Sequence, residues 1–205
     1  SRGDDWVSNQ IYWKGLAGYE PETVSVFLKL SSGAGVTVDV GAYVGFYTIL
    51  AAHANPSGRV YAFEPHPEAY PRLRRNVQLN RLSNVECIQA AVGDAEGSAD
   101  FYCGPGGLPT SSSLSLDFMR PHGTVRGVRV KVVALDEFVR ERGIARIDLL
   151  KIDTESTEPQ VLQGMLETLQ RDRPSIICEV LQGRGAEERL EDILGRLGYR
   201  YYLLT

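Results

Sequence analysis

The stretch Val38-Asp39-Val40-Gly41-Ala42-Tyr43-Val44-Gly45-Phe46-Tyr47-Thr48 decides the fold of this chain. It predicts a buried strand that enters a turn with two glycines, Gly41 and Gly45, and a helix that begins directly after the turn. Glycine lets a backbone turn sharply and lets a ligand approach it closely. The first turn of a helix presents free N–H groups, which favour an anionic ligand group. The stretch therefore predicts a strand, a ligand-binding turn and a helix in direct succession.

Apolar segments alternate with amphipathic helical segments along the rest of the chain. Short apolar strands separated by helices are typical of a parallel sheet that is covered on both faces. We therefore expect an α/β fold with a mostly parallel, twisted sheet and helices on both faces. Such sheets bind ligands beyond the carboxyl ends of their strands, where the strand order reverses. The predicted strands are Val36–Val40, Arg59–Phe63, Val85–Gln89, Ile147–Ile152, Ser175–Glu179 and Tyr199–Leu204, and the helices between them begin near Gly45, Glu68, Glu158 and Gly185.

The residues before the first strand differ in character. Residues 1–20 are aromatic and polar, and we expect them to form an irregular cap. A helix is predicted to open at Pro21, because proline is tolerated in a first helical turn. This organisation gives an N-terminal cap and helix over residues 1–35 and an α/β domain over residues 36–205, which together form one compact domain.

One segment interrupts the alternation. Two further strands are predicted at Ser98–Tyr102 and Val128–Val133, and the loop near residues 103–127 between them is rich in glycine, proline and serine. A loop of this length inside a domain is either functional or poorly ordered. We expect a lid or a substrate-facing segment, with a flexible insertion as the alternative.

The composition limits the classes of partner. The 205 residues carry 22 Lys and Arg against 26 Asp and Glu. Nucleic-acid-binding domains are usually basic, so no nucleic-acid partner is expected. No apolar run approaches the ~20 residues that a membrane span needs, so no membrane partner is expected either. The cysteines Cys87, Cys103 and Cys178 form no Cys-x-x-Cys pair, which argues against a zinc site and fits a reducing cytoplasm.

A carboxylate follows the second predicted strand. Glu64 lies 23 residues after Gly41, where it is placed to accept hydrogen bonds from both hydroxyls of a ribose. The glycine turn and this acid together indicate a cofactor that contains adenosine. The Gly-x-x-x-Gly spacing differs from the Gly-x-Gly-x-x-Gly of pyrophosphate-binding turns, which disfavours a nicotinamide cofactor. His66 is expected to border the cofactor or to stay exposed. The alternative is a tight strand–helix turn with a chance acid downstream.

Several motifs, taken in order, resemble the FkbM-type methyltransferases over most of the chain, from about residue 12 to residue 198. The resemblance implies a Rossmann-like class I methyltransferase fold and S-adenosylmethionine as methyl donor. It also implies an oxygen acceptor on a sugar, a polyketide or another secondary metabolite. The motifs are Asp39-Val40-Gly41-Ala42-x-x-Gly45-Phe46-Tyr47-Thr48, Phe63-Glu64-Pro65-x-Pro67, Leu73-Arg74-x-Asn76-Val77, Ala91-Val92-Gly93-Asp94 and Leu150-Lys151-Ile152-Asp153.

This resemblance implies a set of cofactor-binding residues. The helix N-terminus is expected to receive the methionine carboxylate, and Asp39 the ammonium. Ala91 or Val92 is expected near the adenine. Two features depart from the family's pattern. The family's fourth-strand motif continues Asp-x-Glu-Gly, whereas Ser156 replaces that glycine here. The family's final antiparallel strand is expected beyond the last residue of this sequence. The full expected set is Asp39, Gly41, Ala42, Tyr43, Gly45, Tyr47, Thr48, Glu64, Pro65, Ala91, Val92 and Asp153.

Three acids are predicted to lie beside the transferred methyl group. Lys151 and Asp153 share one side of the fourth strand, Glu155 follows in the loop, and Glu179 ends the fifth strand. We expect Asp153 to position the acceptor or to accept its proton, and Glu155 and Glu179 to shape the acceptor site. Asp153 and Glu179 could hold a divalent ion, although the spacing does not require one. The alternatives are that Glu155 only favours a helix N-terminus and that Lys151 is a structural ion-pair partner.

Two rival functions stay open at this point. A methyltransferase acting on nitrogen in a nucleic acid usually places Asn/Asp-Pro-Pro-aromatic after the fourth strand, whereas this chain has Asp153-Thr154-Glu155-Ser156. A non-catalytic module that binds S-adenosylmethionine would keep the cofactor motifs and lose the acceptor site. The favoured prediction is an O-methyltransferase with a small hydroxylated acceptor, and the sequence does not indicate its oligomeric state.

Overall fold

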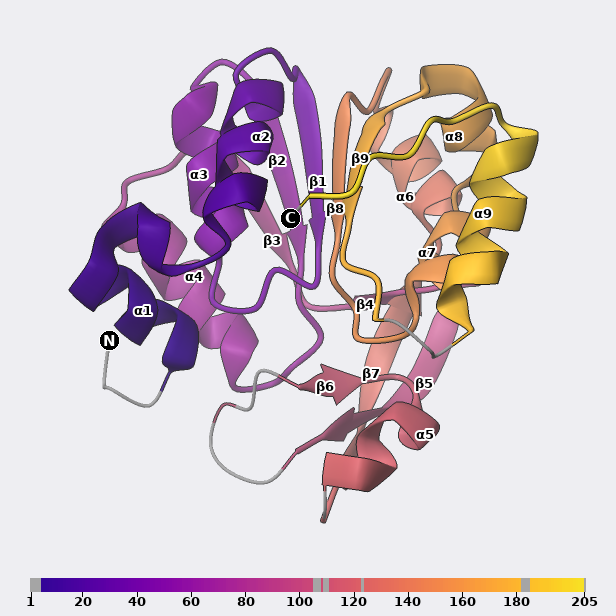
Figure 1. Cartoon of the computed structure of the whole chain (residues 1–205), viewed down its shortest axis with the longest axis horizontal. Helices are drawn as coiled ribbons and strands as arrows, with labels where there is room; N and C mark the ends of the chain where they lie inside the picture. The colour runs from indigo at the N-terminus through magenta and orange to yellow at the C-terminus, as the bar shows by residue number, and fades with distance from the viewer. Residues whose placement is uncertain (1–4, 105–107, 109–110, 123, 182–184, 205) are drawn as a thin grey trace.

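A computed structural model of the chain describes every residue except 1–4, 105–107, 109–110, 123, 182–184 and 205. It contains a five-stranded sheet and a four-stranded sheet. Helices lie on both sides of the larger sheet, and the smaller sheet extends from one end of it (Figure 1). No helix in the described part of the chain combines the length and apolarity needed to cross a membrane. The predicted α/β class with helices on both faces is confirmed.

The larger sheet is parallel throughout. Its strands are ordered β3-β2-β1-β8-β9, so the order reverses between β1 and β8. This reversal leaves the carboxyl ends of β1 and β8 open to a ligand. The strands are β1 (Val36–Val40), β2 (Arg59–Phe63), β3 (Val85–Ile88), β8 (Leu149–Ile152) and β9 (Ser175–Cys178).

Alternate side chains of these strands pack against two helical layers. Val38 and Leu150 belong to the core cluster under one layer, whereas Val60 and Leu149 belong to the cluster under the other. Because both faces are covered, each strand reads as almost continuously apolar. The first layer is α6 (Leu135–Arg142), α7 (Glu158–Gln163), α8 (Leu166–Asp172) and α9 (Ala186–Arg196), and the second is α2 (Pro21–Ser31), α3 (Phe46–Ala54) and α4 (Ala69–Leu79) (Figure 1).

The smaller sheet contains the two strands predicted around the insertion. β5 and β7 pair antiparallel, with Phe101 opposite Val128, and β4 pairs parallel with β7. Of the predicted loop at 103–127, residues 105–107, 109–110 and 123 lie outside the described residues, and the remainder is partly regular. The elements are β4 (Ala91–Val92), β5 (Gly97–Cys103), β6 (Ser112–Ser113), α5 (Leu116–Met119), a 3₁₀ turn (Arg120–His122) and β7 (Arg126–Val133).

The prediction of an irregular cap over residues 1–20 was wrong for residues 5–20, which the structure describes. Residues Trp6–Lys14 form the helix α1, and a 3₁₀ turn follows at Gly15–Gly18. Asp5 caps the helix, because its side chain accepts a hydrogen bond from the N–H of Val7 at 3.1 Å. Val7 is the buried side chain of α1, so the helix lacks the repeating apolar face that would have revealed it.

The predicted strand Tyr199–Leu204 was also wrong. Residues 199–204 are described and form no strand, and Tyr202 and Leu203 are exposed. A strand needs a neighbour for its backbone N–H and C=O groups, and no described strand pairs with this segment. The helix predicted near Glu158 is interrupted at Gly164, where a Cβ atom would lie 2.0 Å from the carbonyl oxygen of Gly93.

Candidate functional site

The backbone conformation of the glycine turn and the residues packed against it explain why Gly41 and Gly45 are glycines. Gly41 and Gly45 have φ angles of 82° and 93°, in the left-handed region that glycine adopts without strain. A Cβ atom on Gly41 would lie 1.8 Å from the carbonyl oxygen of Asp153, and one on Gly45 would lie 2.6 Å from Leu73 Cδ1. The prediction that these positions need glycine is consistent with this geometry. The close approach is to the backbone that follows β8, whereas the sequence suggested only a ligand.

Parallel pairing continues past the strand ends and brings the site together. The N–H of Asp153 donates to the carbonyl of Val40 at 3.0 Å, and the N–H of Glu179 donates to the carbonyl of Ile152 at 3.0 Å. The N–H of Gly41 donates to the carbonyl of Phe63 at 3.0 Å. The residues that follow β1, β2, β8 and β9 therefore lie side by side at one edge of the sheet.

Glu64 is buried and organises the turn. Its Oε2 accepts a hydrogen bond from the N–H of Tyr43 at 2.6 Å, and its Oε1 accepts one from the N–H of His66 at 2.7 Å. Burial raises the pKa of Glu64 to about 7, although the two hydrogen bonds act in the opposite direction. A carboxylate oxygen can accept more than one hydrogen bond. Glu64 can thus hold the turn and still accept hydrogen bonds from a ribose.

A cavity of about 420 Å³ opens at this edge of the sheet. Its wall combines predicted residues with Trp6 and Tyr19 of the aromatic N-terminal segment, with Leu114 of the predicted insertion, and with Phe101 of β5, which the sequence did not indicate. The predicted residues that line it are Gly41, Tyr43, Glu64, Pro65, Ala91, Val92, Asp153, Glu155 and Glu179. The predicted residues outside its lining are Asp39, Ala42, Gly45, Tyr47 and Thr48.

Asp39 lies behind the cavity in a buried polar network. Its Oδ2 accepts a hydrogen bond from Thr48 Oγ1 at 2.6 Å, and burial raises its pKa despite the nearby Lys151 ammonium. Lys151 Nζ lies 4.5 Å from the centre of the Tyr47 ring, a cation–π contact. Tyr47 in turn donates its hydroxyl hydrogen to Glu20 Oε2 at 2.6 Å. The structure turns this carboxylate toward α3, and Asp39 does not line the cavity. Its contact with a ligand ammonium stays a prediction.

Asp153 and Glu179 form a carboxyl pair at the cavity wall. Lys151 Nζ lies 3.0 Å from Asp153 Oδ2. Burial opposes the ionisation of Asp153, but the Lys151 ammonium outweighs it and lowers the pKa of Asp153. The negative charge of Asp153, then burial and a hydrogen bond between the carboxyl groups, raise the pKa of Glu179 to about 8. At neutral pH the pair holds one negative charge and one proton.

His66 lines the cavity and is buried, so the alternative that it stays exposed is wrong. Its Nδ1 accepts hydrogen bonds from the N–H groups of Glu68 at 3.1 Å and Ala69 at 3.3 Å, at the start of α4. Burial lowers the pKa of His66, so the imidazole is neutral and carries its proton on Nε2. Nε2 has no hydrogen-bond partner within the described part of the chain. His66 therefore offers an unused donor close to Glu64.

Metal-ligating side chains do not gather in the described part of the chain: no group of three or more His, Cys, Asp and Glu residues there could hold an ion. The three cysteines are free thiols. Asp153 and Glu179 alone provide two to four of the six to eight oxygen ligands that Ca²⁺ takes.

Comparison with known proteins identifies the family. The model of the methyltransferase FkbM domain family matches residues 39–201. The chain belongs to this family. Among the relatives of this FkbM domain, the methyltransferase sdnD of Sordaria araneosa is 29% identical over 189 residues, which cover 79% of this chain and 72% of the relative. The 31-O-demethyl-FK506 methyltransferase FkbM of Streptomyces tacrolimicus is 30% identical over 175 residues, which cover 74% of this chain and 67% of the relative.

Solved structures share the fold of this FkbM domain. The methyltransferase FkbM from Methylobacillus flagellatus KT superposes with a TM-score of 0.56 at 16% identity, over 79% of this chain and 37% of that chain. The precorrin-6y C5,15-methyltransferase from Geobacter metallireducens GS-15 superposes with a TM-score of 0.54 at 17% identity, over 87% of this chain and 72% of that chain. These likenesses show that the FkbM domain shares its fold with solved methyltransferase structures.

The loop after β8 departs from the FkbM motif at Ser156. Glu155 and Ser156 have φ angles of 56° and 84°, a conformation that L side chains rarely adopt. Glu158 holds the loop, because its Oε1 accepts hydrogen bonds from the N–H groups of Thr154 at 3.2 Å and Ser156 at 3.1 Å. Ser156 Oγ is buried without a hydrogen-bond partner in the described region. The loop therefore keeps a backbone shape that suits glycine.

Replacing Ser156 by glycine is expected to stabilise the fold by about 1 kcal/mol, because it relieves the left-handed strain and removes a buried hydroxyl without a partner. Thermal unfolding should show a midpoint about 2–4 °C higher. The control is Ser57→Gly at an exposed turn without positive φ, which should be neutral or slightly destabilising. An equal or lower stability of Ser156→Gly would show that the serine is not strained.

Proposed function

We propose that this FkbM domain transfers the methyl group of S-adenosylmethionine to a hydroxyl oxygen of a small molecule. The observation that carries the proposal is that Glu64 and the Asp153–Glu179 pair line the same cavity. Two relatives support the oxygen acceptor by name: the 31-O-demethyl-FK506 methyltransferase and the 2-O-methyltransferase NoeI of Sinorhizobium fredii. Their acceptors suggest a sugar or a polyketide.

The cofactor end of the cavity suits an adenosine with an attached amino acid. Glu64 accepts hydrogen bonds from the ribose hydroxyls, and the carboxylate extends beyond the lining of this cavity to the N-terminal N–H groups of α3. Ala91 and Val92 provide an apolar wall for the adenine, and both are buried and line the cavity. The His66 Nε2–H group is available to an acceptor atom of the adenosine. S-Adenosylmethionine supplies an electrophilic methyl group on its sulfonium.

The acceptor end of the cavity suits a hydroxyl group that must lose its proton. Displacement at the methyl carbon needs the acceptor oxygen to be held in line, so most of the rate acceleration comes from positioning. The Asp153–Glu179 pair lies at the wall and takes up the hydroxyl proton. Glu155 adds a third carboxyl group, and burial and the charge of Asp153 raise its pKa to about 7.

Replacing Glu64 by alanine is expected to weaken the binding of S-adenosylhomocysteine about 100-fold, because two hydrogen bonds to a carboxylate are lost. Isothermal titration calorimetry measures this directly. Glu68→Ala is the matched control, since Glu68 is an exposed acid four residues away and lies outside the cavity lining. Glu64→Gln, which keeps the side-chain volume, serves if the alanine variant does not fold.

Two results would contradict the proposal. Unchanged affinity of folded Glu64 variants for S-adenosylhomocysteine would remove the ribose contact. Tight binding of NAD to the wild type, with no binding of S-adenosylmethionine or S-adenosylhomocysteine, would show that the cofactor is a nicotinamide nucleotide. Incubation with labelled donor and a panel of hydroxylated metabolites, with and without Mg²⁺, tests transfer itself; cofactor binding without transfer across the panel would favour a non-catalytic binding module.

A further inference from the structure

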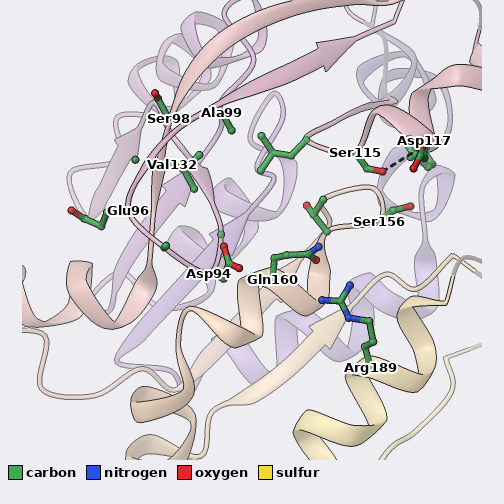
Figure 2. A pocket seen from close by; sticks show the side chains of 16 residues that line it. Asp94, Glu96, Ser98, Ala99, Ser115, Asp117, Val132, Ser156, Gln160 and Arg189 are labelled. Atoms are coloured by element: carbon green, nitrogen blue, oxygen red, sulfur yellow. Dashed lines mark hydrogen bonds between the residues drawn. The ribbon is translucent and has the colours of Figure 1, made fainter.

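A second cavity, of about 740 Å³, adjoins the cavity of about 420 Å³ at the strand ends, which we call the cofactor cavity. Leu114 and Thr157 line both cavities and therefore lie where the two cavities meet. The remaining walls come from the turn between β4 and β5, from α5, and from α7 and α9. Figure 2 shows Gln160 of α7 and Arg189 of α9 reaching toward each other into this space, with Ser156 nearby. The volume is within the range of about 300–1,000 Å³ typical of ligand sites.

Side chains of this second cavity carry unused hydrogen-bonding capacity. Gln160 Oε1 and Ser156 Oγ are buried and have no hydrogen-bond partner in the described residues. Arg189 forms no ion pair with any described residue, although its helix carries the Arg196–Asp192 pair at 2.8 Å. Buried polar groups without partners are costly and are normally satisfied by a ligand or water. Rotation of the Gln160 amide about its last bond would present either its oxygen or its NH₂ group to a ligand.

The same walls determine the chemistry of a suitable ligand. Asp94, Glu96 and Asp117 accept hydrogen bonds only, whereas Arg189 donates only. A hydroxyl group can both donate and accept, so a ligand with several hydroxyls satisfies all of these groups at once. Asp117 is paired with Arg120 at 3.2 Å, so Asp94 and Glu96 leave two carboxylates against the one guanidinium of Arg189, which disfavours a ligand that carries its own negative charge.

Part of the cavity wall is apolar. Phe118, Leu114 and Val132 line it together, and Phe118 and Val132 are largely buried. A sugar ring presents C–H groups on one face and hydroxyls around its edge. It therefore fits an apolar patch beside polar side chains better than a uniformly apolar ring does.

We propose that this second cavity binds an uncharged sugar ring of the methyl acceptor, while the hydroxyl to be methylated reaches past Leu114 and Thr157 to the Asp153–Glu179 pair. The inference rests on the proposed O-methyltransferase function and specifies its substrate class. Gln160 and Arg189 are its specificity-determining residues, since they contact the sugar away from the reacting atoms.

Saturation-transfer difference NMR on the full chain, with and without saturating S-adenosylhomocysteine, tests this proposal. The probes are methyl glucopyranoside, methyl glucuronoside and cyclohexanol, which differ in charge and hydroxyl content. We expect signals from the glucopyranoside that exceed those from both other probes. Gln160→Leu and Arg189→Met should each reduce these signals about fivefold, through loss of hydrogen bonds. Arg196→Met, an exposed arginine on the same helix outside the cavity, should leave them unchanged.

Three outcomes would overturn the sugar site: no glucopyranoside signal in the wild type, a stronger signal from the glucuronoside or cyclohexanol, or full signals in both cavity variants. Calorimetry with S-adenosylhomocysteine on the same preparations separates this result from the proposed function. All three variants should bind it within about twofold of the wild type, because none of the substituted residues lines the cofactor cavity. Loss of that binding in the wild type would refute the cofactor assignment instead.

Discussion

Replacing Gly41 by alanine is expected to destabilise the folded chain by about 3 kcal/mol, the largest stability effect that the structure predicts. The new Cβ atom would lie 1.8 Å from the carbonyl oxygen of Asp153, so backbone at the ends of β1 and β8 would have to separate. The φ of 82° adds strain that an L side chain cannot relieve. Urea unfolding, followed by circular dichroism, measures the difference in the free energy of unfolding.

Gly33→Ala is the matched control for this substitution. Gly33 is exposed, has no positive φ, and would place its Cβ atom in open space. The same chemical change should therefore alter stability by less than about 1 kcal/mol. Similar unfolding curves for Gly41→Ala and Gly33→Ala would show that the backbone at Gly41 lies further from the carbonyl oxygen of Asp153 than the structure has it.

Replacing Glu179 by glutamine is expected to lower kcat for hydroxyl methylation about 100-fold, the effect typical of a lost general base. The pH profile should change with it. Below pH 8 the Asp153–Glu179 pair already holds one proton, and a second would have to bind to Asp153, whose pKa is lowered. Above pH 8 the ionised pair accepts a proton readily, so the wild-type rate should rise with pH, reach half its maximum near the pKa of about 8 and level off above it.

The measurement is the rate of transfer from labelled S-adenosylmethionine to the best acceptor in a panel of hydroxylated compounds, recorded across the pH range. The glutamine variant should lose the rise near pH 8 and keep its affinity for S-adenosylhomocysteine. Glu22→Gln, an exposed carboxylate on α2, should reproduce the wild-type profile. A pH rise that survives in Glu179→Gln would assign the proton to another group.

The sequence predicted those parts of the site that depend on local backbone geometry. The left-handed turn restricts Gly41 and Gly45 to glycine, and Glu64 follows β2 directly, so all three could be identified from a short stretch. The charged neighbours of Asp39 could not be identified in this way. Which buried charge faces it depends on the pairing of β1 with β8, which joins residues more than one hundred positions apart.

The missed elements have different causes. The helix α1 has no repeating apolar face, so only its capping residue Asp5 could have indicated it. The helix α6 does carry such a face, with Leu135, Phe138 and Val139 buried, and ends at Gly143 with a φ of 61°. This spacing is readable in the sequence, but the helix follows the strand β7 without an intervening loop, so no turn signal marks where it begins. The apolar end of the chain suggested a strand, but periodicity alone does not supply a neighbour to pair with.

The position of Trp6, Tyr19 and Glu20 on the cofactor cavity has a consequence for how this enzyme family can diversify. These residues precede position 39, where the match to the shared domain begins. Glu20 is tied to the shared domain, because Tyr47 donates a hydrogen bond to its carboxylate, whereas Trp6 lies before the resemblance that begins near residue 12. Substitutions at the Trp6 end of the cavity can therefore change which molecules enter while the glycine turn and Glu64 stay intact.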